Sequence, residues 1–156
     1  MPDDKVFLIT GASTGIGAAT ARQAAQAGYR LVLAARSEDK LRDLAGELGG
    51  DERALAVRCD VAEWNDQQAL VERALAAYGR IDVAFANAGF GGARGFKSAT
   101  PEEWKSMVLT NVYGAALTIR AVYDALVEHK GHLLLTSSVA GRRALRARST
   151  PSPSMR

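Results

Sequence analysis

The sequence holds a single cysteine and has no apolar run long enough to cross a membrane. None of its 156 residues belongs to a stretch of 18 consecutive apolar residues, which excludes an ordinary transmembrane helix. Residues 1–5 are polar and acidic rather than basic, which argues against a secretory signal. Cys59 lies in an apolar run and is expected to be a small buried side chain, not a reactive thiol. We expect a cytoplasmic protein with no membrane partner and no metal site.

The sequence also lacks the features of a nucleic-acid-binding protein, although its formal net charge is +3. Five of the 20 basic residues lie in the last 15 positions, namely Arg142, Arg143, Arg146, Arg148 and Arg156. Without those five, 15 basic residues stand against 17 acidic ones, so the basic excess belongs to the end of the chain. No basic helix or aromatic platform accompanies it, so nucleic acid is not an expected partner.

Five short apolar runs alternate with helical segments, at residues 6–9, 30–35, 54–58, 81–85 and 132–136. Continuous apolar runs of this length are typical of parallel strands that are buried on both faces. Strands that alternate with helices through short links predict a parallel sheet with right-handed crossovers and helices on both faces. The expected fold class is therefore α/β, a doubly wound parallel sheet of the Rossmann type.

Local signals predict where the shorter helices begin and end. Ser37 fits an N-cap, and Gly28 and Gly79 are placed to end the first and third helices. Apolar residues recur at helical spacing in the second and third helices, at Leu41, Leu44 and Leu48 and at Leu70, Ala74 and Ala77.

The clearest helix start is Thr100, followed by Pro101 and by Glu103, which is placed to close a capping box. A long helix is expected from there to about Lys130, ended by Gly131.

A glycine-rich turn at residues 10–17 follows the first strand directly and opens the first helix. Glycines there allow a tight turn, let the backbone approach a pyrophosphate and leave helix N–H groups free for phosphate oxygens. A flexible loop is the alternative interpretation of such a turn, but its position between strand and helix favours phosphate binding. Three residues separate Gly11 from Gly15, so the spacing differs from the common dinucleotide fingerprint.

With Thr in front, this turn resembles the Thr-Gly-x-x-x-Gly-x-Gly motif of the classical short-chain dehydrogenase/reductase family. Further matches follow in the family's order: Asp60 matches its adenine-contacting Asp, Asn87 begins its Asn-Ala-Gly turn, and Asn111 and Ser138 match its catalytic-site Asn and Ser. Ala86 stands where a further Asn is usual. The resemblance covers residues 5 to about 145. Singly, these residues also fit a helix cap, a turn and a strand end, but their joint order favours the family.

The resemblance implies a set of site residues. For cofactor binding these are Gly11, Ser13, Thr14, Gly15, Ile16, Gly17, Arg36, Asp60, Val61, Asn87, Ala88 and Gly89. For catalysis it implies Ser138, to orient or polarise a carbonyl, and Asn111, to hold a proton-relay water. The implied activity is that of an oxidoreductase that moves hydride between a nicotinamide and a small-molecule carbonyl or alcohol. Family members are usually homo-oligomers.

The residues after the second strand favour NADP over NAD. An NAD enzyme usually places an acidic residue there for the ribose 2′-hydroxyl, whereas a 2′-phosphate requires a cation. Ala35 fills the acidic position and Arg36 follows it, with Ser13 and Ser37 as further hydroxyl donors. The alternative is that Arg36 only caps a solvated loop.

The chain departs from the family after Ser138. The family's proton donor is a Tyr with a Lys four residues further on, and this Tyr is expected near Thr150, where none occurs. Tyr113 and Tyr123 fall in the long helix and are expected to be packing residues. We therefore expect a Rossmann domain at residues 1–141 that is truncated after its fifth strand. The remainder, residues 142–156, is expected to be an aberrant, disordered tail.

Three interpretations of the chain remain open. The first is an NADP-dependent oxidoreductase whose active site is incomplete in this chain, so that it is inactive alone. The second is a non-catalytic nucleotide-binding module, and the third is a non-functional frameshifted product. The truncation leaves the apolar fifth strand with an unpaired edge, so we expect marginal solubility and self-association.

A reading-frame shift makes a prediction about the DNA. Codons for Arg148 to Arg156 can be chosen so that another frame reads Leu-Tyr-Ala-Val-Thr-Lys-His-Ala, which restores the Tyr and the Lys at the family's spacing. We expect the DNA that follows to continue a family-like frame, and sequencing it is the measurement. DNA without such a frame would refute the frameshift.

Overall fold

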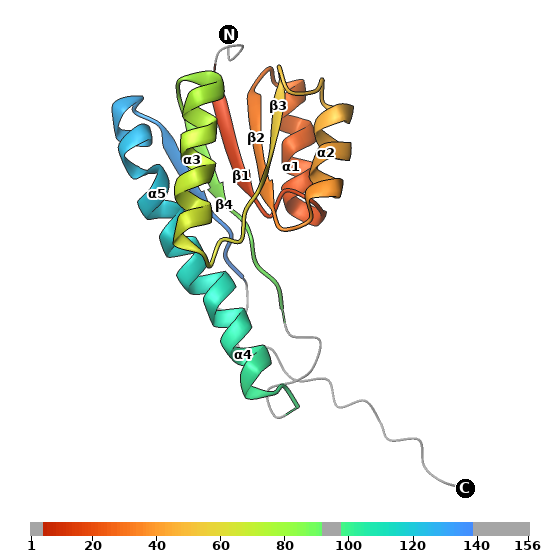
Figure 1. Ribbon diagram of the computed structural model, residues 1–156, viewed down its shortest axis with the longest axis vertical. Coiled ribbons are helices and arrows are strands. Elements are labelled where there is room, and N and C mark those ends of the chain that lie inside the picture. The colour runs from red at the N-terminus through yellow and green to blue at the C-terminus, as the bar shows by residue number, and fades with distance from the viewer. Residues whose placement is uncertain (1–4, 92–97, 139–156) are drawn as a thin grey trace, which may run out of the picture.

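A five-stranded parallel sheet forms the centre of the computed structural model, which describes residues 5–91 and 98–138. Its strands are β1 (Val6–Thr10), β2 (Arg30–Ala35), β3 (Ala54–Arg58), β4 (Val83–Ala86) and β5 (His132–Leu135). Their order is β3-β2-β1-β4-β5 (Figure 1). The chain therefore builds outward from β1 in one direction and then, from β4, in the other. This confirms the doubly wound parallel sheet that the sequence predicts.

Helices cover both faces of this sheet. One face carries α1 (Gly15–Gln26) and α2 (Glu38–Glu47), and the other carries α3 (Trp64–Tyr78) and α5 (Ala115–Glu128) (Figure 1). Alternate strand residues feed the two layers: Leu8 packs in the α3 and α5 layer, and Ile9 in the α1 and α2 layer. No helix of the described residues is long and apolar enough to span a bilayer.

Four strand limits differ from the expected ones, and two of them only by one added residue, because β1 ends at Thr10 and β4 at Ala86. The fourth strand begins at Val83, not at residue 81, although Ile81 is fully buried. Ile81 owes its burial to side-chain packing, and the apolar pattern alone could not distinguish that from strand pairing. The fifth strand ends at Leu135, one residue before the expected limit.

The long helix begins as predicted. The Thr100 hydroxyl accepts a hydrogen bond from the Glu103 N–H at 3.2 Å, and the Glu103 carboxylate accepts one from the Thr100 N–H at 2.8 Å. Its end is different, because Lys130, not Gly131, takes the left-handed conformation, with φ of 51°. Gly131 is needed for space: a Cβ there would lie 2.5 Å from the Asp82 carbonyl oxygen.

This helix is not one regular α-helix. It consists of α4 (Pro101–Val108), a π-helical segment η1 (Leu109–Gly114) and α5. Asn111 and Gly114 lie in η1, and π-helical turns occur frequently at functional sites. The spacing of apolar residues in the sequence did not predict this π-helical segment.

The expectation for the two helical tyrosines is wrong. Tyr113 on η1 and Tyr123 on α5 are 47% and 61% exposed. The buried residues of these two segments are others, among them Gly114, Val122 and Leu126. Ala77 on α3 is also exposed, although Leu70 and Ala74 are buried as expected.

β5 is an edge strand of the sheet and pairs with β4. All four of its residues are exposed, including Leu133, Leu134 and Leu135. Exposed leucines on both faces of an edge strand are the feature from which self-association was expected, and self-association stays a prediction. The tail expected at 142–156 lies outside the described residues.

A buried carboxylate supports the start of the sheet. Asp82 accepts hydrogen bonds from the Val6 N–H at 2.9 Å and from the Arg80 guanidinium at 2.6 and 2.9 Å. Burial raises the pKa of this carboxyl, but the bonds from Arg80 and Val6 outweigh burial and hold the pKa below its usual range. The ionised form of Asp82 therefore stabilises the fold.

We predict that Asp82→Asn lowers the free energy of unfolding by about 1–3 kcal/mol at pH 7, because two charge-assisted bonds are lost. Since the pKa is lowered in the folded state, this contribution is present above the unfolded pKa of about 4 and disappears as the pH falls through the folded value. Denaturant unfolding at several pH values measures it. Asp43→Asn, an exposed change on α2, is the control, and equal stability of the two variants at pH 7 would contradict the prediction.

Candidate functional site

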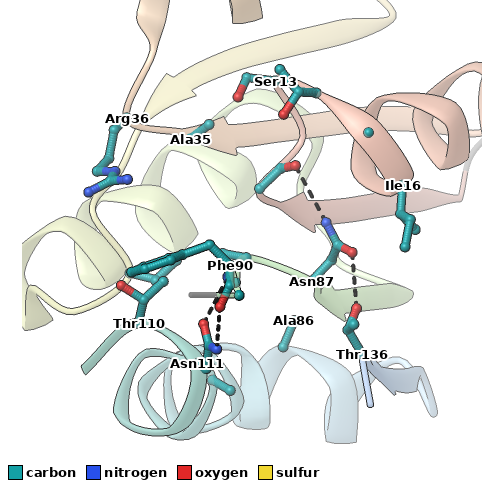
Figure 2. Close-up of a pocket in the computed structure, with 18 of the residues that line it drawn as sticks. Ser13, Ile16, Ala35, Arg36, Ala86, Asn87, Phe90, Thr110, Asn111 and Thr136 are labelled. Atoms are coloured by element: carbon teal, nitrogen blue, oxygen red, sulfur yellow. Dashed lines mark hydrogen bonds between the residues drawn. The ribbon is translucent and has the colours of Figure 1, made fainter. Parts of the chain in front are cut away.

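A cavity of about 770 Å³ lies at the carboxyl ends of the strands. Residues that follow β2, β3, β4 and β5 line it together with the turn between β1 and α1 and part of η1 (Figure 2). The sheet order reverses between β1 and β4, and ligands of open α/β sheets bind at that position.

Glycine is required in the glycine-rich turn both by positive φ angles and by close packing. Gly11 and Gly15 have φ of 66° and 56°, which favour glycine. A Cβ on Gly11 would lie 2.8 Å from the Ala88 Cα, and one on Gly17 would overlap the Gly11 carbonyl oxygen. Gly15 has nothing within 4 Å of its Cβ position, so its backbone is open.

The first turn of α1 points its N–H groups at this opening. Such groups have no acceptor inside their own helix, and they attract phosphate oxygens. Thr14 occupies the N-cap without a capping bond from its side chain, and Ile16 is 65% exposed beside it. The turn, the helix start and the size of the cavity together fit the pyrophosphate of a dinucleotide.

Asn87 ties three strand ends together. Its Nδ2 donates to the carbonyl oxygens of Thr10 at 3.1 Å and Gly11 at 3.4 Å, and its Oδ1 accepts from the Thr136 hydroxyl at 2.9 Å (Figure 2). Sequence reasoning placed Asn87 in the cofactor site but gave it no such structural role. Thr136 was missed altogether, because nothing in the sequence marks a partner 49 residues away.

Thr10 is a second residue whose role the sequence did not reveal. Its hydroxyl donates to the Phe85 carbonyl at 3.3 Å and accepts from the N–H groups of Asn87 and Ala88 at 3.1 and 3.2 Å. The only signal was its place at the head of the glycine motif. Thr10 and Asn87 therefore fix the backbone that forms this wall of the cavity.

Asn111 is clamped to the loop after β4. Its Oδ1 accepts from the Phe90 N–H at 3.0 Å, and its Nδ2 donates to the Phe90 carbonyl at 2.8 Å (Figure 2). A Cβ on Gly89 would lie 3.0 Å from the Asn111 Oδ1, so Gly89 makes room for this clamp. Ser138 lines the same cavity from the β5 side.

The side of the cavity next to β2 carries a positive charge, that of Arg36, as the sequence predicts. Ala35, Arg36 and Ser37 line it, with Ser13 from the glycine turn. Arg36 is exposed and forms no ion pair with any residue in 5–91 or 98–138 (Figure 2).

The side next to β3 is formed by Cys59, Asp60 and Val61. Asp60 Oδ1 accepts from the Ala62 N–H at 3.1 Å, and the Asp60 N–H donates to the Asp66 carboxylate at 2.8 Å. Burial, aided by Asp66 and Asp60, raises the pKa of Cys59 to about 12. The thiol is therefore protonated at neutral pH, in agreement with the buried, unreactive cysteine that was expected.

The structure brings nearly all of the expected site residues to one cavity. Those that line it are Gly11, Ser13, Thr14, Gly15, Ile16, Arg36, Asp60, Val61, Asn87, Ala88, Gly89, Asn111 and Ser138. Gly17 does not line it, because Gly17 packs beneath the turn against Gly11. No group of three or more metal-ligating side chains is found among the described residues.

Known proteins with the same sequence pattern and fold are numerous. The sequence model of the short chain dehydrogenase family matches residues 5–151. An uncharacterized oxidoreductase of Listeria monocytogenes is 39% identical over 143 residues, which cover 90% of this chain and 58% of that protein. The chain thus spans about three fifths of the length of such relatives.

Two solved structures share the fold at a TM-score of 0.85. One is an alcohol dehydrogenase from the archaeon Thermococcus sibiricus complexed with 5-hydroxy-NADP, 36% identical, covering 90% of this chain and 61% of that one. The other is a 3-ketoacyl-(acyl-carrier-protein) reductase from Brucella melitensis complexed with NADH, 34% identical, covering 91% and 61%. By its motifs, its fold and these matches, the chain belongs to the short chain dehydrogenase family.

Proposed function

We propose that this chain binds NADP at the carboxyl edge of its sheet, as the cofactor-binding part of a cytoplasmic oxidoreductase for small carbonyl or alcohol substrates. The observation that carries the cofactor choice is the pair Ala35 and Arg36 at the cavity. One of the two solved relatives is complexed with 5-hydroxy-NADP and the other with NADH, so membership of the family does not decide between NADP and NAD.

The residues of the chain divide the binding between them. The N–H groups at Gly15 and Ile16 would hold the pyrophosphate, and Asp60 and Val61 would face the adenine. The Arg36 guanidinium would pair with the 2′-phosphate, helped by the hydroxyls of Ser13 and Ser37. An acidic side chain at Ala35 would repel that phosphate, and none is present.

The chemistry on the β5 side is proposed from Ser138 and Asn111. When bound, the nicotinamide would supply or accept a hydride. The Ser138 hydroxyl would orient the carbonyl oxygen of the substrate, and Asn111 would hold the Phe90 backbone in place beside it. A water held by Asn111 for proton transfer stays a prediction. The two solved relatives are named for an alcohol and a 3-ketoacyl substrate, which supports this substrate class.

Among the described residues, no side chain at the cavity is an evident proton donor to the substrate. The tyrosines of the sequence are Tyr29, Tyr78, Tyr113 and Tyr123, and no Tyr or Lys is among the described residues that line the cavity. We therefore propose that the chain alone binds the nucleotide and is a poor catalyst.

The first test concerns the cofactor. We expect NADPH to bind more tightly than NADH, and Arg36→Asp to abolish or reverse this preference. Loss of the charge-assisted contact should weaken NADPH binding by about 1.5–3 kcal/mol, or roughly tenfold to a hundredfold. Calorimetric titration with both nucleotides is the measurement.

Lys40→Asp is the matched control for Arg36→Asp. Lys40 is exposed on α2 and does not line the cavity, so its replacement makes the same change of charge nearby. It should leave the preference for NADPH intact. Equal affinity of the unaltered chain for both nucleotides would exclude the proposed cofactor choice.

The second test concerns turnover. We expect the unaltered chain to oxidise NADPH only slowly with a panel of ketones and aldehydes, because a placed proton donor contributes about 10²–10⁴-fold and none is evident at the cavity. Absorbance of NADPH at saturating nucleotide is the measurement. Rapid ketone- or aldehyde-dependent oxidation of NADPH by the unaltered chain would contradict the proposal.

A further inference from the structure

A buried carboxamide lies behind the cavity, in a place where an apolar residue would be expected. Gln67 on α3 is fully buried and is surrounded by the apolar cluster to which Leu70 and Ala74 belong. Among the described residues it is one of very few polar side chains with no exposed surface. A buried amide is costly unless it is hydrogen-bonded, so its partners indicate what it does.

Three oxygens accept hydrogen bonds from the Gln67 Nε2. They are the Thr118 hydroxyl at 2.8 Å, the Val61 carbonyl at 3.0 Å and the Gly114 carbonyl at 3.4 Å. Thr118 itself donates to the Gly114 carbonyl at 2.9 Å, so its hydroxyl is an acceptor toward Gln67. Because all three are acceptors, the NH₂ group must face them.

These partners join two walls of the cavity. Val61 follows β3 and lines the cavity, whereas Gly114 ends the π-helical segment η1, which carries Asn111. The backbones approach closely at this point: a Cβ on Gly114 would lie 2.6 Å from the Val61 Cγ2. The position of η1 against the loop after β3 is thus set by the close approach of Gly114 to Val61 and by the hydrogen bonds of Gln67.

The other atom of the carboxamide is not satisfied. The Gln67 Oε1 is buried and has no hydrogen-bond partner among the described residues. An unpaired buried acceptor is costly, so the Oε1 offsets part of the stabilisation that the bonds of the NH₂ group provide. Gln67 is therefore better explained by the geometry that its NH₂ group imposes than by the stability it contributes.

We propose that Gln67 is a positioning residue that fixes η1 to the loop after β3. It thereby holds Asn111 in its clamp on Phe90 and couples that clamp to the nucleotide-binding wall at Val61. The coupling rests on the proposed nucleotide site, whereas the fixing of η1 does not. Gln67 touches neither the cavity nor Asn111, and it acts through Val61 and Gly114.

The first experiment needs no nucleotide. In Gln67→Met, which keeps the length but loses the donor, we expect hydrogen exchange of the amides of residues 109–118 to rise roughly five- to tenfold, as for a lost hydrogen bond. The amides of α1 and α2 are the internal reference for global stability and should not change. Exchange measured by NMR or mass spectrometry gives both.

Leu70→Met is the matched control, because it places the same residue at a fully buried position of the same helix without removing a hydrogen bond. Thr118→Val should reproduce the effect of Gln67→Met, and Thr118→Ser, which keeps the hydroxyl, should restore protection. Unchanged exchange at 109–118 in Gln67→Met would overturn the proposal. An equal rise in Leu70→Met would also overturn it, because packing alone would then explain the protection.

The second experiment tests the coupling. With saturating NADP, the unaltered chain should gain protection both at the glycine-rich turn and at residues 109–118. In Gln67→Met, NADP should increase protection at the glycine-rich turn but not at residues 109–118. An equal gain in both proteins would refute the coupling. If the unaltered chain gains no protection at the turn, the proposed nucleotide site fails, and the nucleotide-free comparison still decides the role of Gln67 on η1.

Discussion

One carboxamide joins the three strands at which the cavity opens. Past the end of β5, the Thr136 N–H still donates to the Ala86 carbonyl at 3.2 Å. Asn87 adds side-chain hydrogen bonds there, to the Thr10 and Gly11 carbonyls and to the Thr136 hydroxyl. The Thr10 hydroxyl adds three bonds from behind, one of them to the Ala88 N–H. The nucleotide-facing backbone of β1 and β4 therefore forms a single unit.

The glycines of the turn follow from the same arrangement. The Asn87 Nδ2 would lie 3.2 Å from a Cβ on Gly11 and 2.8 Å from one on Gly17. A methyl group at either position would displace the carboxamide and separate the strand ends that it joins. Because the start of α1 packs this closely on Asn87, its free N–H groups are held in place before any ligand binds. A site organised in advance loses less entropy on binding.

Sequence reasoning succeeded where a local rule decides the structure. Apolar runs located all five strands, and the Thr100 capping box and the Gly79 helix end have purely local causes. It failed where the cause lies elsewhere in the chain. The π-helical segment contacts Val61 and Gln67, which lie far from it in the sequence, and Gly131 is required by the Asp82 carbonyl. All of the expected site residues except Gly17 line one cavity. The bonds of Asn87 and Asn111 to backbone could not be foreseen from their spacing.

The two halves of the cavity lie on strands that differ in burial. The nucleotide half lies over β1 and β2, whose residues are almost all fully buried between two helical layers. Ser138 follows β5, every residue of which is exposed. Local stability rises with buried apolar contact, so we expect β5 and residues 136–138 to open more readily than the glycine-rich turn. Nucleotide binding and the proposed orientation of a substrate by Ser138 would therefore depend on separate parts of the fold. Two hydrogen bonds connect the buried strands to the less buried side of the cavity. Asn87 after β4 bonds to Thr136 after β5, and Gln67 on α3 bonds to Gly114 of η1.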